Sequence, residues 1–179
     1  MIPVHVDKIS YHPSSRSYAV LLKEENSEKV LPILVGSFEA QSIALALEVV
    51  ETPRPLTHDL ICEMIKKIDA KLISVNISQL NEGVFYAKLK IKGLKFGIKQ
   101  IDSRPSDAIS IALRLNAPIY VSPEVIKEAG VNQEDISEES SLTPKYSIED
   151  LELKLKKAVE KEDYEKAAKL RDKLKELDS

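Results

Sequence analysis

Apolar and polar positions follow two different periods along the chain, and the period changes at Gly36. Before Gly36, apolar residues alternate with polar neighbours in residues 2–6. Two further runs, 18–22 after a serine-rich bend and 29–35 after a charged turn, complete a pattern that predicts antiparallel strands. After it, apolar residues recur at helical spacing up to residue 50 and cover most of the circumference. We therefore expect a largely buried helix there, with Ser37 as its cap.

A second helix and a second group of strands follow. Pro53-Arg54-Pro55 ends the first helix, and Thr57 is placed to cap the next one. The remaining expected elements are strands at 72–80, 84–91 and 94–101, a buried helix from Ser103 through 115, a strand at 119–121 and a helix at 122–129. Because strands and helices come in blocks, the pattern predicts an α+β fold with a mostly antiparallel sheet and buried helices.

The C-terminal residues have a separate pattern. Residues 147–179 carry two apolar stripes at helical spacing with a charged break between them, which predicts an antiparallel helical hairpin. Residues 131–146 have four acidic groups against one basic group, and they read as an extended linker. The chain is thus expected to have an α+β domain at 1–130, an acidic linker and a hairpin.

A hairpin of this size is too small to bury a core alone. It should close on the domain, on a second copy or on a partner, although a solvated tail helix would give a similar pattern. The run from Asp163 to Asp172 resembles the UVR motif of UvrB- and UvrC-type excision-repair proteins and of several protease adaptors. That resemblance implies a protein-binding device whose contacts would be Tyr164, Ala167, Ala168, Leu170, Arg171 and Leu174.

Composition limits the location of the protein. No apolar stretch approaches the roughly 18 residues that span a bilayer. The start of the sequence lacks the pattern of a signal peptide, and Cys62 is the single cysteine, so no internal disulfide can form. We therefore expect a cytoplasmic protein without a membrane partner. The environment of Cys62, among apolar neighbours, indicates packing rather than chemistry.

Polar residues on the two buried helices are the first candidates for chemistry. Arg104, Asp107, Ser110 and Arg114 fall on one stripe of the helix after residue 103. The helix after Gly36 carries a similar stripe of Ser37, Gln41 and Glu48, with Glu39 and Ser42 on a neighbouring line. If Glu39, Asp102 and Asp107 converge, they could bind Mg²⁺ or Mn²⁺ while Arg104 steadies a phosphate, as phosphodiester hydrolysis requires.

The same residues have a structural interpretation. Asp107 stabilises its own helix through the dipole, and Arg104 or Arg114 could neutralise an acid at a subunit contact. The pair His58-Asp59 is a weaker candidate, because an acid is expected in the first turn of a helix and an exposed histidine is no ligand by itself. His5 and His12 have no partner at the spacing of metal ligands.

A lysine-rich hairpin is the second candidate. If Lys92-Gly93 forms a two-residue turn, Lys90 faces Lys95 and Tyr86 faces Lys99. The expected nucleic-acid-binding face then consists of Tyr86, Lys88, Lys90, Lys95 and Lys99, which would attract DNA or RNA phosphates. An ordinary solvated face, or an edge strand protected by lysines, is the alternative.

Three segments of the domain resemble the bifunctional nuclease family. They are the run from Leu31 to Ala44, the run from Arg54 to Leu60 and, above all, Ile101-Asp-Ser-Arg-Pro-Ser-Asp-Ala. The resemblance implies an α+β homo-oligomer and nuclease activity on DNA and RNA. At the matching positions we select Glu39, Asp59, Arg104 and Asp107 as catalytic, with Asp102 as a further metal ligand. The alternative function is a non-catalytic oligomeric adaptor that recruits a repair or proteolysis partner through the hairpin.

Overall fold

The computed structural model describes residues 1–12, 17–25 and 27–132, which form an α+β domain around a single mixed sheet. The strands are β1 (Ile2–His12), β2 (Ser17–Glu24), β3 (Lys29–Val35), β4 (Ala70–Asn81), β5 (Val84–Gly93), β6 (Gly97–Ser103), β7 (Ile119–Val121) and β8 (Val131–Asn132). Within these residues their order is β6-β5-β4-β7-β1-β2-β3-β8. Neighbours are antiparallel except β4 and β7, which are parallel. The predicted fold class is therefore confirmed for the domain.

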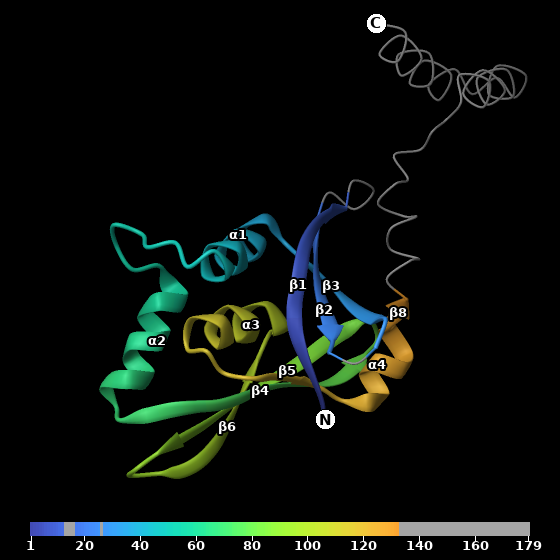
Figure 1. Cartoon of the computed structure of the whole chain (residues 1–179). Coiled ribbons are helices and arrows are strands. Elements are labelled where there is room, and N and C mark those ends of the chain that lie inside the picture. Colours follow the sequence, from blue (N-terminus) through green and yellow to red (C-terminus); the bar gives the residue numbers. More distant parts are fainter. Residues whose placement is uncertain (13–16, 26, 133–179) are drawn as a thin grey trace, which may run out of the picture. The chain divides into compact units, whose positions relative to one another are not determined.

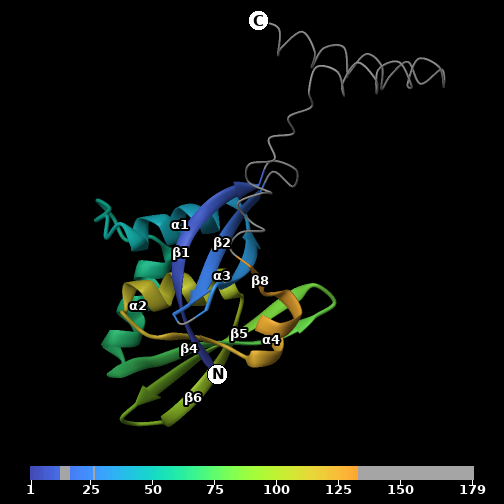
Figure 2. The same cartoon turned by 45° about the vertical axis from the view of Figure 1, so that its right-hand side comes forward.

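Helices cover the sheet and fill its curve. They are α1 (Ser37–Leu47), α2 (Thr57–Lys67), α3 (Pro105–Arg114) and α4 (Pro123–Ala129). Figures 1 and 2 show α3 between α1 on one side and strands β4 and β5 on the other. Helix α4 contacts both β3 and β4, strands that are far apart in the sheet order, so the sheet must curl to bring them together.

The core explains why α3 is the central helix. Ala108, Ile109, Ile111 and Ala112 of α3 are buried, and they belong to one cluster with the inward side chains of β4 and β5. Small alanine side chains allow α1 and α3 to approach closely, because less volume separates the two helix axes. This packing brings the polar residues of α1, α2 and α3 to one junction.

Helix α1 differs from the sequence prediction. It ends at Leu47, Gly36 rather than Ser37 is its N-cap, and its cap has no side-chain hydrogen bond. It is also less buried than predicted, since Phe38 is 84% exposed and Leu47 and Val50 are exposed as well. The prediction was wrong because apolar residues around the whole circumference do not reveal which side contacts the core.

The β5–β6 hairpin has a different register from the predicted one. Gly93 pairs with Gly97, so residues 94–96 form the turn and Lys90 faces Gln100 instead of Lys95. A β-carbon on Gly93 would lie 2.3 Å from the Phe96 ring. The Phe96 ring therefore occupies the space beside Gly93, and this packing gives a three-residue turn in place of the two-residue turn that Lys92-Gly93 suggested.

The linker and the predicted helical hairpin lie outside the described residues. So do the predicted partner contacts, from Tyr164 to Leu174. Among the residues that are described, no helix is long and apolar enough to cross a membrane.

Candidate active site at the junction of three helices

Arg104 connects two helices at the start of α3. It is the N-cap residue of α3, and its guanidinium group donates to both oxygens of Asp107, from Nε to Oδ2 at 2.9 Å and from Nη2 to Oδ1 at 3.1 Å. Its Nη1 donates to Glu39 Oε1 of α1 at 3.1 Å. Three of the predicted site residues, Glu39, Arg104 and Asp107, are thus in direct contact.

Glu39 reaches Arg104 because a glycine precedes its helix. Its Oε2 lies 2.6 Å from the place that a β-carbon on Gly36 would occupy. The carboxylate therefore folds back over the amino end of α1, where the helix dipole favours a negative charge. A larger residue at Gly36 would displace the Glu39 carboxylate from this position.

His58 of α2 completes the cluster, although sequence reasoning set it aside. Its Nε2 lies 3.1 Å from Asp107 Oδ1, and its Nδ1 lies 2.8 Å from Ser42 Oγ of α1. The side chain is only 15% exposed, so the expectation of an exposed His58 was wrong. Its partners are 49 and 16 residues away in the sequence, and no local pattern signals such contacts.

Two buried serines lie on the Nδ1 side of the His58 imidazole. Ser42 is 7% exposed and Ser110 is 0% exposed, and Ser110 Oγ lies 3.4 Å from Ser42 Oγ. Ser110 had been placed on the polar stripe of α3 by its spacing. The structure shows that Ser110 and Arg114 of this stripe face α1 and α2, whereas Arg104 at its start remains exposed to solvent.

Asp59 belongs to a neighbouring ion pair. Its Oδ1 accepts from Arg114 Nε at 2.6 Å, and its Oδ2 accepts from the backbone N–H of Leu56, the N-cap of α2. Arg114 Nη1 also donates to the carbonyl oxygens of Ser42 and Ser110, each at 3.1 Å. Asp59 and Arg114 therefore join α1, α2 and α3, and Asp59 contacts neither Arg104 nor Asp107 in this network.

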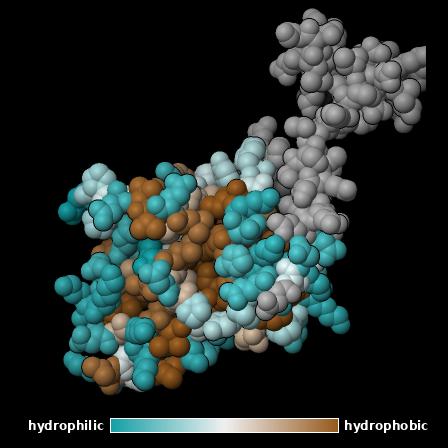
Figure 3. All heavy atoms as spheres, viewed as in Figure 1, coloured by the Kyte–Doolittle hydropathy of each residue, from teal (hydrophilic) through white to brown (hydrophobic). Residues whose placement is uncertain are grey.

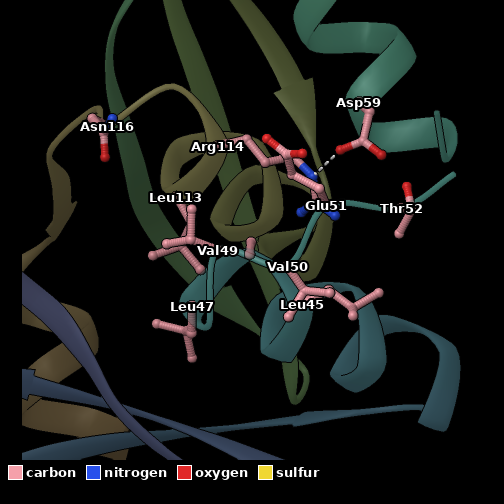
Figure 4. A pocket seen from close by; sticks show the side chains of 11 residues that line it. Leu45, Leu47, Val49, Val50, Glu51, Thr52, Asp59, Leu113, Arg114 and Asn116 are labelled. Carbon is pink, nitrogen blue, oxygen red and sulfur yellow. Dashed lines mark hydrogen bonds and ion pairs between the residues drawn. The ribbon is translucent and has the colours of Figure 1, made fainter. Parts of the chain in front are cut away.

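A hollow of about 400 Å³ lies beside this ion pair (Figure 4). Its lining residues are Leu45, Ala46, Leu47, Val49, Val50, Glu51, Thr52, Asp59, Leu113, Arg114 and Asn116. Figure 3 shows hydrophobic side chains gathered over α1 and α3 on the same side of the domain. The hollow does not include Arg104, Asp107, Glu39 or His58, so it is separate from the cluster around Arg104.

Ion pairs and hydrogen bonds in the cluster shift the pKa values of its charged side chains. Burial raises the pKa of the Asp107 carboxyl, but hydrogen bonds from Arg104 and His58 outweigh burial and hold this pKa below its ordinary value. Hydrogen bonds to Asp107 and Glu39 raise the pKa of Arg104. Burial likewise raises the pKa of Asp59, but the hydrogen bonds from Arg114 and the Leu56 backbone, together with the positive charge of Arg114, outweigh it, so that pKa is lowered too.

The described residues do not form the predicted ligand set for Mg²⁺ or Mn²⁺. Asp102 pairs with Lys88 across β5 and β6, and the two side chains share the face of the sheet that points away from α3. Both Asp107 oxygens accept hydrogen bonds. No three His, Cys, Asp or Glu side chains of the described residues are arranged around a common metal position. The predicted grouping of Glu39, Asp102 and Asp107 is therefore not observed.

The predicted lysine face is divided by the observed register. Tyr86, Lys88 and Lys90 alternate along β5 on its outward face. Lys95 lies in the turn, and Lys99 pairs with Ile91, which places it on the opposite, helix-bearing side of the sheet. The prediction of one continuous face with all five residues was wrong because the assumed turn was one residue shorter than the observed one.

The fold and the cluster define an α+β domain in which arginine, carboxylate and imidazole groups from three helices meet. The chain belongs to the bifunctional nuclease domain family, whose model matches residues 20–134, and the UvrB/uvrC motif matches residues 145–179. Both resemblances drawn from the sequence are thereby confirmed, in the predicted order.

Curated relatives of this chain come from bacteria and plants. An uncharacterized protein of Mycobacterium tuberculosis (strain ATCC 25618 / H37Rv) is 44% identical over 125 residues, which cover 69% of this chain and 73% of that protein. Bifunctional nuclease 1 of Oryza sativa subsp. indica is 29% identical over 66% of this chain and 37% of its own length. Bifunctional nuclease 2 of Arabidopsis thaliana is 27% identical over 92% of this chain and 56% of its own length. The chain thus spans between about a third and three fifths of these two plant proteins.

Proposed function

We propose that this protein hydrolyses phosphodiester bonds in DNA, RNA or both. The convergence of Glu39, His58, Arg104 and Asp107 from three helices carries the proposal. The family match and the names of the plant relatives favour a nuclease over a non-catalytic adaptor. These residues supply a phosphate contact and groups that transfer protons, which are two requirements of the reaction.

Arg104 is the proposed phosphate contact. Its side chain is 66% exposed, and three of the five N–H groups of its guanidinium donate to Asp107 and Glu39. The other two can donate to oxygens of an incoming phosphate. The two carboxylates hold the guanidinium plane in one orientation, so little reorganisation is needed when the phosphate binds.

His58 is the proposed proton-transfer group. Asp107 is held ionised and can only accept, so His58 Nε2 carries the hydrogen of their bond. In the neutral imidazole Nδ1 is then the acceptor, and the Ser42 hydroxyl donates to it. If Nδ1 takes up the proton that an attacking water loses, Nδ1–H then donates to Ser42 Oγ, while Nε2–H continues to donate to Asp107. The Ser42 hydroxyl can bond to His58 Nδ1 with or without a proton on that nitrogen, because a hydroxyl both donates and accepts.

A divalent metal, a nucleic-acid-binding hairpin and a homo-oligomer belong to the proposal as predictions from the sequence. The ligand arrangement described above does not fit Mg²⁺ or Mn²⁺, so no step is assigned to a metal.

Leu60, Met64 and Ile68 support self-association, because they form an exposed apolar stripe at helical spacing along α2 and its C-cap. The UvrB/uvrC motif supports a protein or nucleic-acid partner at the tail. We place the protein in the cytoplasm on the basis of its single cysteine.

Cleavage of labelled single-stranded DNA and RNA by the full chain tests the proposal. We expect Arg104→Lys to lower kcat/KM about a hundredfold, because lysine cannot bond both Asp107 oxygens and also hold a phosphate in a fixed plane. Arg54→Lys, a change of the same kind outside the cluster, should leave kcat/KM within about twofold.

Three results would contradict parts of the proposal. If the parent protein cleaves neither nucleic acid, with or without added Mg²⁺ or Mn²⁺, hydrolysis is not its function. Cleavage that continues unchanged in EDTA would refute the predicted metal requirement and leave the cluster around Arg104 as the site. Equal activity of the Arg104→Lys and Arg54→Lys variants would show that the chemistry lies elsewhere.

A further inference from the structure

The outward face of strands β4 and β5 carries a row of lysines. The register predicted from the sequence did not place all of them on one face. Lys88, Lys90 and Lys92 alternate along β5 and therefore project from the same side. Lys71 of β4 pairs directly with Lys92, which adds a fourth lysine to that side. We call these four residues the lysine row. Neither Lys71 nor Lys92 belonged to the face expected from the sequence.

The lysine row faces away from the cluster around Arg104. The intervening residues Ala87, Leu89 and Ile91 are buried in the core with α3, so the lysines between them point to the other side of the sheet. Figures 1 and 2 both show α1 and α3 on one side of strands β4–β6. Nucleic acid bound to the lysine row would therefore not enter the site of the same chain without passing the edge strand β6.

Repulsion between like charges in the lysine row destabilises the sheet unless a bound anion neutralises them. Lys71 and Lys92 are directly opposite, and like charges in this position destabilise a sheet. On the described part of β6, Asp102 is the acidic residue that shares this face, and it lies opposite Lys88 at one end of the row. The Lys71, Lys90 and Lys92 end thus keeps its positive charge, which a chain of phosphates would neutralise.

We infer that the lysine row, together with Tyr86, binds the backbone of single-stranded nucleic acid at a surface distinct from the cluster around Arg104. Alternate residues on a strand lie about 6.6 Å apart, so Lys88, Lys90 and Lys92 form a straight track about 13 Å long. Tyr86 continues the same alternation and is partly exposed, which suits stacking of one base. This inference deepens the proposed function and rests on it for the class of ligand.

Fluorescence anisotropy with a labelled single-stranded oligonucleotide tests the inference in the full chain. Each lysine–phosphate contact contributes about 0.7 to the slope of log K against log salt for a single strand. We expect the double variant Lys71→Gln/Lys92→Gln to bind roughly ten- to thirtyfold more weakly at 0.1 M salt, with a slope about 1.4 smaller. Tyr86→Leu should weaken single-strand binding about five- to tenfold at every salt concentration.

The matched control is Lys8→Gln/Lys127→Gln, which removes the same charge from exposed lysines on β1 and α4. Equal weakening by the control and the Lys71→Gln/Lys92→Gln variant would overturn the inference, since net charge alone would then explain binding. An unchanged affinity of Tyr86→Leu, or equal losses for duplex and single strand in that variant, would overturn the assignment to single strands.

A small diester separates this inference from the proposed function. Hydrolysis of bis(p-nitrophenyl) phosphate needs no long binding track, so the Lys71→Gln/Lys92→Gln variant should hydrolyse it at the parental rate. A parallel loss of small-diester hydrolysis would overturn the separation of the two surfaces. If the parent protein hydrolyses no diester yet binds the oligonucleotide as described, the proposed function fails and the binding surface stands.

Discussion

At the scale of single residues, Asp107 is the side chain that links the parts of the cluster. It accepts two hydrogen bonds from Arg104 and one from His58, so one carboxylate orients both a cation and an imidazole. Such a group affects stability as well as chemistry, because removing it leaves the largely buried His58 imidazole without its acceptor and frees the exposed Arg104 guanidinium. Its depressed pKa gives this dual role a dependence on pH that can be measured.

We expect Asp107→Asn to lower the free energy of unfolding by about 1–2 kcal/mol at pH 7, as for hydrogen bonds to a charged group. The folded-state pKa of Asp107 is lowered, so its contribution is complete above the unfolded-state pKa of about 3.9 and disappears as the pH falls through the folded-state pKa. The difference between parent and variant should therefore narrow below pH 4. Urea unfolding at pH 7, 5, 4 and 3 measures it.

Asp69→Asn provides the control for this pH series. Asp69 is exposed and has a positive φ of 54°, a conformation that asparagine also tolerates, so the change should cost little at any pH. A difference between the parent and Asp107→Asn that stays constant down to pH 3 would contradict the assignment of the effect to the ionised carboxylate.

At the scale of elements, the three helices bring the cluster together and the hairpin determines which lysines share a face. Helix α1 supplies Glu39 and Ser42, α2 supplies His58, and α3 supplies Asp107, each at a position that faces the same junction. The ion pair between Asp59 and Arg114 fixes the three helices relative to one another. The hairpin of β5 and β6 depends instead on the contact between Gly93 and Phe96.

Gly93→Ala should destabilise the domain by about 1–3 kcal/mol, the usual cost of overpacking. The added β-carbon would meet the Phe96 ring at 2.3 Å, so the ring has to leave its place against the core. A double-mutant cycle with Phe96→Ala isolates this effect, because the same substitution should cost much less once the ring is absent. Chemical denaturation of the parent, the two single variants and the double variant gives the coupling energy.

The cycle also has an outcome that would refute the explanation. If Gly93→Ala costs the same in the presence and absence of the Phe96 ring, the contact does not determine the turn. The register of the lysine row would then need another cause.

At the scale of the whole molecule, the domain and the tail are separate in sequence. The core consists of residues between Val4 and Ile126, whereas the UvrB/uvrC motif begins at residue 145 after the acidic linker. We therefore propose that the domain performs the chemistry and that the tail binds a partner.

We expect deletion of residues 147–179 to leave both domain properties unchanged. The kcat/KM for a single-stranded oligonucleotide should remain within about twofold, and the thermal midpoint within a few degrees, because the deletion removes no residue of the described core. A nuclease assay and calorimetry on the full and shortened chains measure these quantities. Ala167→Glu/Ala168→Glu in the full chain is the control, because it changes the UvrB/uvrC motif without shortening the chain. It should also leave activity and the thermal midpoint unchanged. A large fall in activity or stability on deletion would contradict the division of labour.

Much of the fold could be predicted because its signals are local. Alternation along residues 2–6 and helical spacing after Gly36 report the period of the backbone itself, so the elements were found even where their ends were misplaced. Helical stripes also showed that Glu39, Arg104 and Asp107 could converge, although the sequence suggested a shared metal and a phosphate rather than the ion pairs that the structure shows. The burial of α1 was overestimated, because periodicity does not report what covers a surface.

The sequence by itself determined the α+β class, the family and three of the clustered residues, Glu39, Arg104 and Asp107. Tertiary structure alone decided that His58 joins Asp107, that Asp102 lies on the far face of the sheet and that Lys71 stands beside Lys92. The physical reason is the range of the interactions. A backbone period depends on neighbouring residues, whereas a hydrogen bond across 49 residues or a strand register depends on how whole elements pack, and a shift of one residue reverses the face of every side chain.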